Sequence, residues 1–144
     1  MPAIKHSLTL DAPPERVYPL VSTAQGLAQW WAADITEAGS IDTIELGFFN
    51  RGTTYRLTRT RVLPPHEVQW LCSTGKEWSG TRLWFELKPN NNGTLVRFTH
   101  ADWKDETDYF ISCTTVWGEL MFRLKSAAEG RPRGPLFTHS GQAY

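Results

Sequence analysis

The stretch that decides the fold runs from Asp105 to Glu129 and reads DETDYFISCTTVWGELMFRLKSAAE. It contains no proline, and its apolar residues recur at spacings of three and four: Tyr109, Cys113, Val116, Trp117, Leu120, Leu124 and Ala127. Acidic residues cluster at its start and Arg123 and Lys125 lie near its end, which complements the helix dipole. The pattern predicts one long amphipathic helix, and such a helix needs an apolar surface to cover.

The preceding residues, 33 to 100, supply that surface, because they mostly alternate between apolar and polar side chains. Asn50-Arg51-Gly52 and the Asn-rich run at 89–93 favour hairpin turns. The alternation predicts an antiparallel meander with strands at Asp34–Glu37, Thr43–Phe48, Thr53–Val62, Glu67–Cys72, Gly80–Lys88 and Gly93–Ala101.

The N-terminal part predicts a strand at Ile4–Leu10, a helix at Pro14–Ser22 and a short second helix at Leu27–Trp31. The order of elements is therefore strand, two short helices, about six further strands and one long helix, which predicts an α+β domain. We expect one domain over residues 1–130 and a C-terminal tail over residues 131–144. The tail has no pattern of its own, although Leu136 and Phe137 allow it to pack back on the domain.

Charge and composition exclude several classes of protein. The 144 residues carry 15 basic and 15 acidic side chains, and a balanced charge argues against nucleic acid as a partner. Seven Trp, seven Phe and four Tyr exclude a disordered chain. No signal segment and no apolar run of roughly 20 residues is present, so we expect no membrane association. Cys72 and Cys113 have no metal-site or redox-motif spacing, which favours free thiols in the cytoplasm.

Several segments together resemble one known superfamily. They are Ile4 to Tyr18, the pair Trp30-Trp31, Val68-Gln69-Trp70, the hairpin from Phe85-x-Leu87 to Leu95–His100, and Trp117-x-x-Leu120-x-x-x-Leu124-Lys125. Their order and spacing resemble the START-like, or Bet v 1-like (SRPBCC), superfamily, in the branch of the C-terminal domain of the activator of Hsp90 ATPase. The resemblance implies a helix-grip fold, in which a curved antiparallel sheet of about seven strands wraps around the long C-terminal helix and leaves a cavity.

The superfamily's known activities imply three possible functions. Its members include carriers of hydrophobic ligands, polyketide cyclases and dehydratases, and a co-chaperone domain, and the fold alone does not choose among them. The eukaryotic co-chaperone has a further N-terminal domain, whereas this chain begins at the predicted first strand. That difference argues against Hsp90 as the partner.

Strand parity indicates which side chains face the cavity. The candidate ligand-binding residues are Trp31, Tyr55, Trp70, Phe85, Phe98, His100, Tyr109, Cys113 and Trp117. Apolar walls with a few polar groups are typical of a small-molecule pocket, and the same rings also fill ordinary cores. Four tryptophans near the ends of elements either gate the pocket, form an apolar patch for a homodimer, or close the core: Trp30, Trp31, Trp78 and Trp103.

His100 is the candidate catalytic residue, because Asp102 follows at the same parity and an imidazole beside a carboxylate performs acid–base chemistry. The alternative is a histidine at a strand end that bonds to a backbone carbonyl. We expect no metal and no cofactor, since neither ligand spacings nor phosphate-binding loops occur. The sequence thus predicts a non-enzymatic protein for small hydrophobic or aromatic ligands; the alternatives are a cyclase or dehydratase using His100, with Asp102 or Tyr109, and an interaction module for a chaperone.

Overall fold

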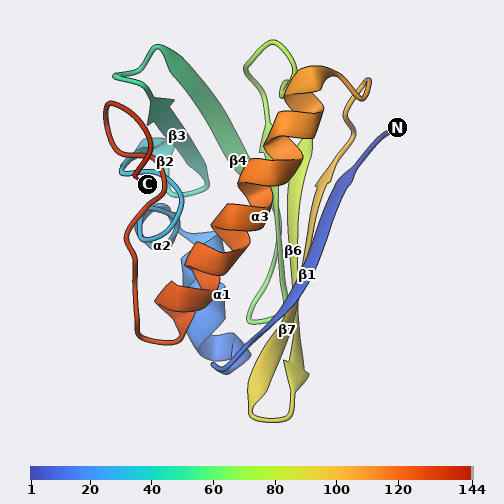
Figure 1. The fold of residues 1–144 in the computed structure, drawn as a ribbon, viewed down its shortest axis with the longest axis vertical. Helices are drawn as coiled ribbons and strands as arrows, with labels where there is room; N and C mark the ends of the chain where they lie inside the picture. Colours follow the sequence, from blue (N-terminus) through green and yellow to red (C-terminus); the bar gives the residue numbers. More distant parts are fainter. Residues whose placement is uncertain (144) are drawn as a thin grey trace.

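A seven-stranded antiparallel sheet curls around a long C-terminal helix (Figure 1). The structure is a computed structural model that describes residues 1–143. Its elements are β1 (Ile4–Leu10), α1 (Pro14–Ser22), α2 (Ala24–Leu27), β2 (Asp34–Ser40), β3 (Thr43–Phe48), β4 (Thr53–Leu63), β5 (Glu67–Cys72), β6 (Arg82–Asn90), β7 (Gly93–Ala101) and α3 (Asp108–Ala128). The α+β helix-grip prediction is confirmed, with most element ends within a few residues of those expected.

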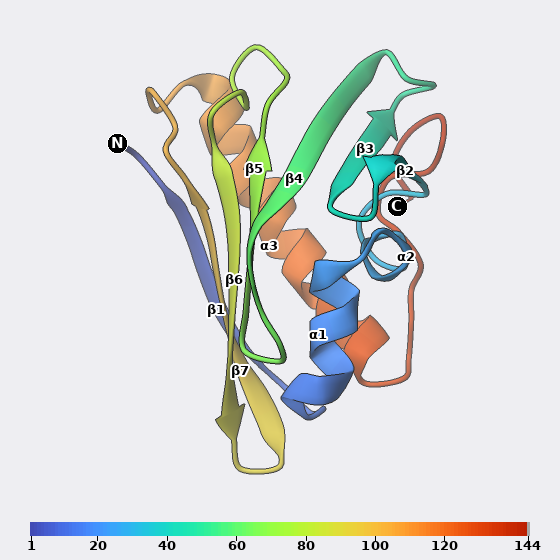
Figure 2. The same ribbon diagram turned by 180° about the vertical axis from the view of Figure 1, so that it is seen from behind.

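The strands follow the order β1-β7-β6-β5-β4-β3-β2, so all of them except β1 pair with their sequence neighbours. β1 returns to pair antiparallel with β7, which places Ile4 opposite His100. The β6–β7 hairpin sets Phe85 opposite Phe98 on the inner face. Seen from behind, β3 and β4 bend away from the long β1, β6 and β7 strands (Figure 2). Because of this bend, the inner face of β3 and β4 lies apart from the inner face of β1, β6 and β7.

The predicted strand parity holds along the central strands. In β5, Val68, Trp70 and Cys72 are fully buried and the residues between them are partly exposed. β7 shows the same alternation, with Val96, Phe98 and His100 buried. A side-chain period of two therefore directs one apolar set toward α3.

Helix α3 covers the inner face of the sheet with one stripe. The Thr107 side chain caps its first turn by accepting a hydrogen bond from the backbone N–H of Phe110 (3.2 Å). Trp117 and Leu124 on this stripe are buried, whereas Phe122 on the opposite side is 58% exposed. Among residues 1–143, no helix combines the length and the apolar character that crossing a membrane requires.

Helix α1 fills the space between sheet and α3 at one end, where it packs against β5, β6 and β7. The position predicted for the second short helix, Leu27–Trp31, is wrong. Thr23 accepts a hydrogen bond from the N–H of Gly26 (2.9 Å) and starts α2 at Ala24. Gly26 is required there, because a Cβ would lie 1.9 Å from the carbonyl oxygen of Pro19. Residues 24–26, which lie between the two predicted helices, thus belong to α2, and Trp30 follows this helix.

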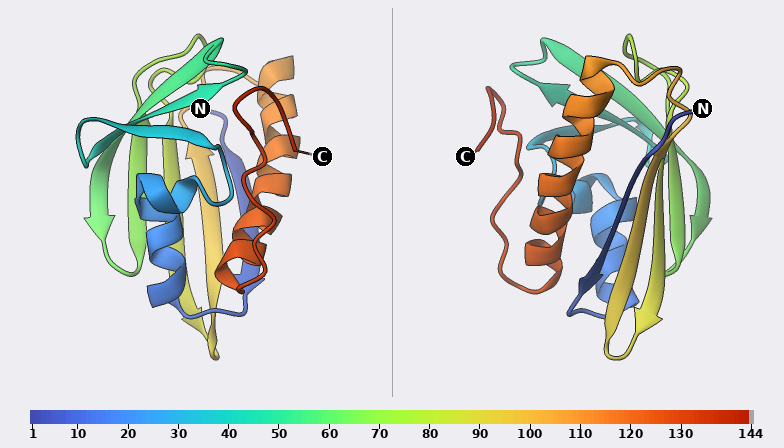
Figure 3. Two further views of the ribbon diagram at one scale, coloured as in Figure 1. Left: turned by 90° about the vertical axis from the view of Figure 1, so that its left-hand side faces the viewer. Right: turned by 45° about the vertical axis from the view of Figure 1, so that its right-hand side comes forward.

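The C-terminal tail packs back on the domain. After α3 it turns and runs upward beside the helix (Figure 3, left). Leu136 is fully buried, and Phe137 forms a parallel bridge with Ala32. The division into a domain of residues 1–130 and a separate tail stays a prediction, and Tyr144 lies outside the described residues.

Candidate functional site

A cavity of about 280 Å³ lies between the first half of α3, the β3–β4 hairpin and the C-terminal tail. Six aromatic rings form much of its wall: Trp31, Phe48, Tyr55, Trp78, Trp117 and Phe137. Polar side chains are few, and include Thr53, Ser112 and Gln142. Within the described part of the chain, no charged side chain lines this cavity. Helix α3 therefore leaves a hollow over part of the sheet.

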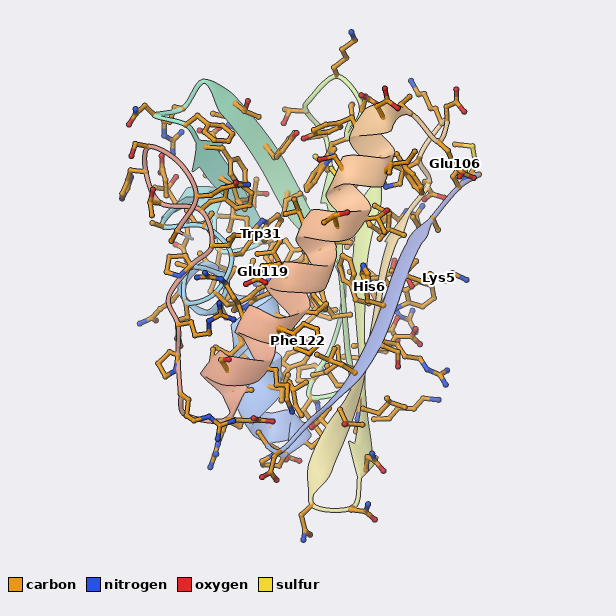
Figure 4. All side chains as sticks on the ribbon, viewed as in Figure 1. Lys5, His6, Trp31, Glu106, Glu119 and Phe122 are labelled. Carbon is orange, nitrogen blue, oxygen red and sulfur yellow. The ribbon has the colours of Figure 1, made fainter. Side chains whose placement is uncertain are left out.

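Ring-to-ring contacts hold these walls in place. Tyr55 stacks on Trp78 with ring centroids 4.2 Å apart and an interplanar angle of 7°. Trp31 lies 5.0 Å from Trp117, in the space between α3 and the tail (Figure 4). Phe48 meets Phe137 edge-on at 5.0 Å. Rings in such mutual contact have defined orientations, so the hollow has a defined shape.

The mouth of the cavity lies beside the first turns of α3. Two of the lining residues are well exposed: Tyr109 in the first turn of α3, at 41%, and Phe49 in the turn after β3, at 52%. The hydroxyl groups of Tyr55 and Tyr109 are 2.7 Å apart and share a hydrogen bond. Burial raises the pKa of both phenols, so both stay neutral. One proton joins the two oxygens, which leaves a second proton and several lone pairs for other partners.

Cys113 also lines the cavity, but its environment keeps the thiol protonated. Burial raises the pKa of Cys113, and the neighbouring Trp78 and Tyr109 side chains offset only part of this effect. Cys72 lies outside the lining; burial raises its pKa to about 11, and its thiol donates to the carbonyl of Thr74 (3.2 Å). Because the thiolate is the reactive form, neither cysteine is set up as a nucleophile.

The structure divides the predicted ligand-binding residues into two groups. Trp31, Tyr55, Tyr109, Cys113 and Trp117 line the cavity. The others, Trp70, Phe85, Phe98 and His100, are buried and lie outside its lining.

Three members of the second group, Trp70, Phe85 and Phe98, are buried on the strands that α1 contacts. The indole N–H of Trp70 donates to the carbonyl of Val21 in α1 (2.9 Å). Phe85 and Phe98 lie 5.0 Å apart between their centroids. Strand parity identified these residues as inward-facing, but it carried no information on where α1 fills the space.

His100 is fully buried in a chain of hydrogen bonds. Its Nδ1 accepts from the indole N–H of Trp117 (3.1 Å), so its Nε2 carries the proton and donates to Thr81 (2.9 Å). The Thr81 hydroxyl in turn donates to the carbonyl of Trp78 (2.6 Å). Burial lowers the pKa of His100 to about 3. Both ring nitrogens are engaged, and the imidazole has no contact with the cavity.

The expected pair of His100 and Asp102 does not form. Strand β7 ends at Ala101, and Asp102 takes a left-handed backbone conformation with φ of 69°. The parity of the strand is lost there, and the Asp102 carboxylate faces the Arg82 guanidinium instead (3.4 Å). The correction follows from where the strand stops, which the alternation alone did not indicate.

Sequence reasoning missed several cavity residues. Phe48 and Phe49 border the turn in which Phe49, Asn50 and Arg51 have positive φ values of 53°, 56° and 63°. The available sequence signal for these two cavity residues was the pair of phenylalanines directly before the turn at residues 50–52. Phe137 of the tail had no periodic pattern to identify it as a wall.

Two further hypotheses from the sequence concern a metal site and an exposed patch of tryptophans. Among residues 1–143, no group of three or more His, Cys, Asp or Glu side chains is placed to hold a metal ion. Trp30, Trp31, Trp78 and Trp103 are all at most 5% exposed, so they form no surface patch and instead belong to the core or to the cavity wall.

A family model matches most of the chain. The family model for "Activator of Hsp90 ATPase homolog 1-like protein" matches residues 11–129. The chain belongs to this family. The match covers β2 to β7 and the three helices; it begins after β1 and ends before the C-terminal tail. A search of curated proteins found no match.

Solved structures agree with the family. The Aha1 dimer from Colwellia psychrerythraea is 33% identical, with a TM-score of 0.78, and the alignment covers 91% of this chain and 98% of that one. Protein BH1534 of Bacillus halodurans is 24% identical over 90% of this chain and 98% of that chain, with a TM-score of 0.70. CalU16 of Micromonospora echinospora is 18% identical over 92% and 68%, with a TM-score of 0.73. The last two show a shared fold.

Proposed function

We propose that this protein binds a small hydrophobic or aromatic molecule in the cavity between its sheet and α3. The supporting observation is a hollow of about 280 Å³ with aromatic walls, an exposed mouth and no charged lining residue among those described. Apolar walls with a few polar groups are the usual composition of a small-molecule site. The proposed ligand is uncharged, because a charge moved into such a site would lose its hydration without a partner.

The size of the hollow limits the ligand. A protein cavity of roughly 150 Å³ holds one benzene molecule. This cavity, at about 280 Å³, has nearly twice that volume and matches a compound of about two fused rings. The spare proton of the Tyr55–Tyr109 pair provides a donor for a hydroxyl or carbonyl oxygen on such a ligand.

Binding without covalent chemistry fits the state of the reactive groups. The His100 imidazole has both nitrogens engaged inside the protein, and burial raises the pKa of the Cys113 thiol. The cyclase or dehydratase alternative requires a free base at the cavity, and His100 does not supply one in this arrangement. We therefore propose a carrier or sensor rather than an enzyme.

A thermal-shift titration with 2-naphthol tests the proposal. A ligand at 100 times its Kd stabilises the folded state by about 2.7 kcal/mol. For a chain of this length, that stabilisation raises the melting temperature by roughly 5–10 °C. An unchanged melting temperature with 2-naphthol and with other neutral bicyclic compounds would remove the basis of the proposal.

A matched pair of variants locates the binding site. Val116 lines the cavity, and Val116→Phe fills part of it. Ile111 lies on the opposite side of the same helix and is 57% exposed, so Ile111→Phe adds a similar ring outside the cavity. We expect the first variant to lose the 2-naphthol shift and the second to keep it. Equal shifts in both would place the ligand elsewhere.

The family description provides a second candidate, an interaction with an Hsp90-type chaperone. Purified Hsp90 is the direct probe: co-sedimentation and an ATPase assay with and without this protein measure binding and activation. Bound protein and a changed ATPase rate would establish this function. If the protein does not co-sediment with Hsp90, ligand binding is the proposal that remains.

We also propose that the protein forms a homodimer. The relative from Colwellia psychrerythraea is described as a dimer, and here Ile111 and Phe122 lie three turns apart on one exposed side of α3 at 57% and 58% exposure. Light scattering after size exclusion tests this: the double variant Ile111→Glu/Phe122→Glu should yield monomers. The free, buried thiols of Cys72 and Cys113 support a location in the reducing cytoplasm.

A further inference from the structure

The C-terminal strap, residues 131–143, forms part of the cavity wall although the family match ends at residue 129. It runs back beside α3 toward the β3–β4 hairpin (Figure 3, left). Phe137 and Gln142 from this strap line the cavity. The edge-on contact of Phe137 with Phe48 (5.0 Å) joins the strap to β3 across the hollow. A segment outside the sheet and helices therefore completes the site.

Backbone hydrogen bonds attach the strap to the body at two places. The N–H of Phe137 donates to the carbonyl of Trp31 (3.0 Å), and the N–H of Ala33 donates to the carbonyl of Phe137 (2.9 Å). Further along, the N–H of Asn50 donates to the carbonyl of His139 (2.6 Å). Both attachments join the strap to residues beside the cavity, so releasing them would move Phe137 away from the other rings.

Arg123 forms the third attachment of the strap. This arginine is only 4% exposed, on the side of α3 that faces the strap. Its guanidinium donates to the carbonyls of Arg133 (3.3 Å), Gly134 (3.1 Å) and Ala143 (2.6 Å), and so reaches both ends of the strap. Glu119, labelled on α3 in Figure 4, accepts from the same group (3.2 Å) and balances its charge. One side chain thus holds three strap carbonyls.

Two glycines, one directly before the strap and one within it, are positions at which its backbone can change direction. Gly130 and Gly134 have positive φ values of 81° and 78° and open space around their Cα atoms, which allows the backbone to pivot at both positions. Leu136 and Phe137 are its buried hydrophobic side chains, and residues at its start and tip are exposed. Segments with few buried apolar contacts open at lower free energy than the core.

We propose that the strap is the gate of the cavity, latched by Arg123, and that it swings out to admit a ligand and closes over it. The proposal rests on the proposed ligand-binding function. It assigns Arg123 a positioning role: the guanidinium touches the strap and not the ligand, and it sets the rate at which the cavity opens.

Hydrogen exchange on the full-length protein tests the opening. We expect the strap-linked amides of Phe137 and Ala33 to exchange faster than those of β6 and β7. Arg123→Met should speed exchange at these amides by about tenfold while β6 and β7 stay unchanged, because the three carbonyls lose their shared donor. Arg97→Met removes a charge from an exposed position on β7 and is the matched control. Strap amides that exchange only at the rate of the sheet would overturn the gate.

Stopped-flow binding of 1-aminonaphthalene, a fluorescent bicyclic probe that is uncharged at neutral pH, tests the link to the cavity. Arg123→Met should raise both the association and the dissociation rate, whereas Arg97→Met should match the unmodified protein. In the opposite direction, a disulfide in Asn50→Cys/His139→Cys should fix the strap, because the backbone N–H of residue 50 already donates to the carbonyl of residue 139 (2.6 Å). We expect the oxidised form to bind the probe at least about tenfold more slowly, with recovery on reduction.

The outcomes separate the two proposals. If the probe binds at equal rates in the unmodified, Arg123→Met and oxidised proteins, the gate is wrong and the binding function stands. If neither the probe nor 2-naphthol binds any of them, the binding function fails and the gate fails with it. Rates that rise in Arg123→Met and fall in the oxidised form establish both.

Discussion

The two ends of the protein's interior have the same sequence pattern and opposite packing. Around Phe85 and Phe98, α1 fills the space under the sheet and the core is solid. Around Tyr55 and Trp31, the strap rather than a helix equivalent to α1 closes that end within the described residues, and a cavity of about 280 Å³ remains. Alternation along the strands is alike in both halves. Thus the element opposite the sheet decides whether inward-facing rings form a core or a binding site.

Alanine substitutions give the largest expected difference between the halves. Phe85→Ala should lower the free energy of unfolding by about 3–5 kcal/mol, because it opens a void in a fully packed region. Phe48→Ala should cost roughly half as much or less, because Phe48 already borders the hollow. Urea denaturation of both variants measures this. Equal losses would mean that the two halves are packed alike.

Added volume should act in the opposite sense. Val96 is fully buried in the packed half, and Val96→Phe should lower stability by about 1–3 kcal/mol through overpacking. Val116→Phe places its ring toward the hollow and should change stability by less than about 1 kcal/mol. Thermal denaturation of the two variants decides the matter. A larger loss for Val116→Phe would show that the cavity has no room for a ring.

His100, which is buried behind the cavity-wall residues Trp78 and Trp117, makes the stability of the protein depend on pH. The pKa of His100 is about 3 in the folded protein, whereas the ordinary value of a histidine is about 6.5. Between these two pH values the unfolded chain binds a proton that the folded chain does not. Stability therefore falls as the pH is lowered toward 3. His100→Gln keeps a donor and an acceptor but does not titrate. Between about pH 7.5 and pH 5, it should remove about 2 kcal/mol of the acid-induced loss, measured by urea denaturation. Identical pH profiles would contradict the buried neutral imidazole.

The smallest effect is expected at the mouth of the cavity. Tyr109→Phe removes the hydrogen bond to the Tyr55 hydroxyl (2.7 Å) at a position that is 41% exposed. The loss of stability should be about 1 kcal/mol or less, because water replaces part of the bond. The affinity for 2-naphthol should fall while that for naphthalene stays unchanged. Equal losses for both compounds would show that the hydroxyl pair does not contact the ligand oxygen.

The sequence predicted the fold well, because the burial of apolar side chains determines both the sequence pattern and the arrangement of the elements. The spacing of apolar residues from Tyr109 to Ala127 required a helix on a sheet, and the period of two along β5 and β7 fixed which side chains face it. Trp70 and Phe98 were therefore rightly predicted to face inward.

The site was less predictable, because it depends on what lies opposite the strands. Nothing in the alternation shows that Trp70 packs against α1 while Tyr55 lines the cavity. Phe137 belongs to an irregular tail, and only the folded chain reveals it as a wall. Asp102 shows the same limit, since one residue of left-handed backbone after β7 removed its expected contact with His100.

A crystal structure of the protein soaked with 2-naphthol tests the central claim most directly. The cavity should hold the bicyclic ring between Trp31, Tyr55 and Trp117, and the core around Phe85 should be unchanged. A cavity that stays free of the compound at saturating concentration, or one that proves to be filled by the protein's own side chains, would contradict the account.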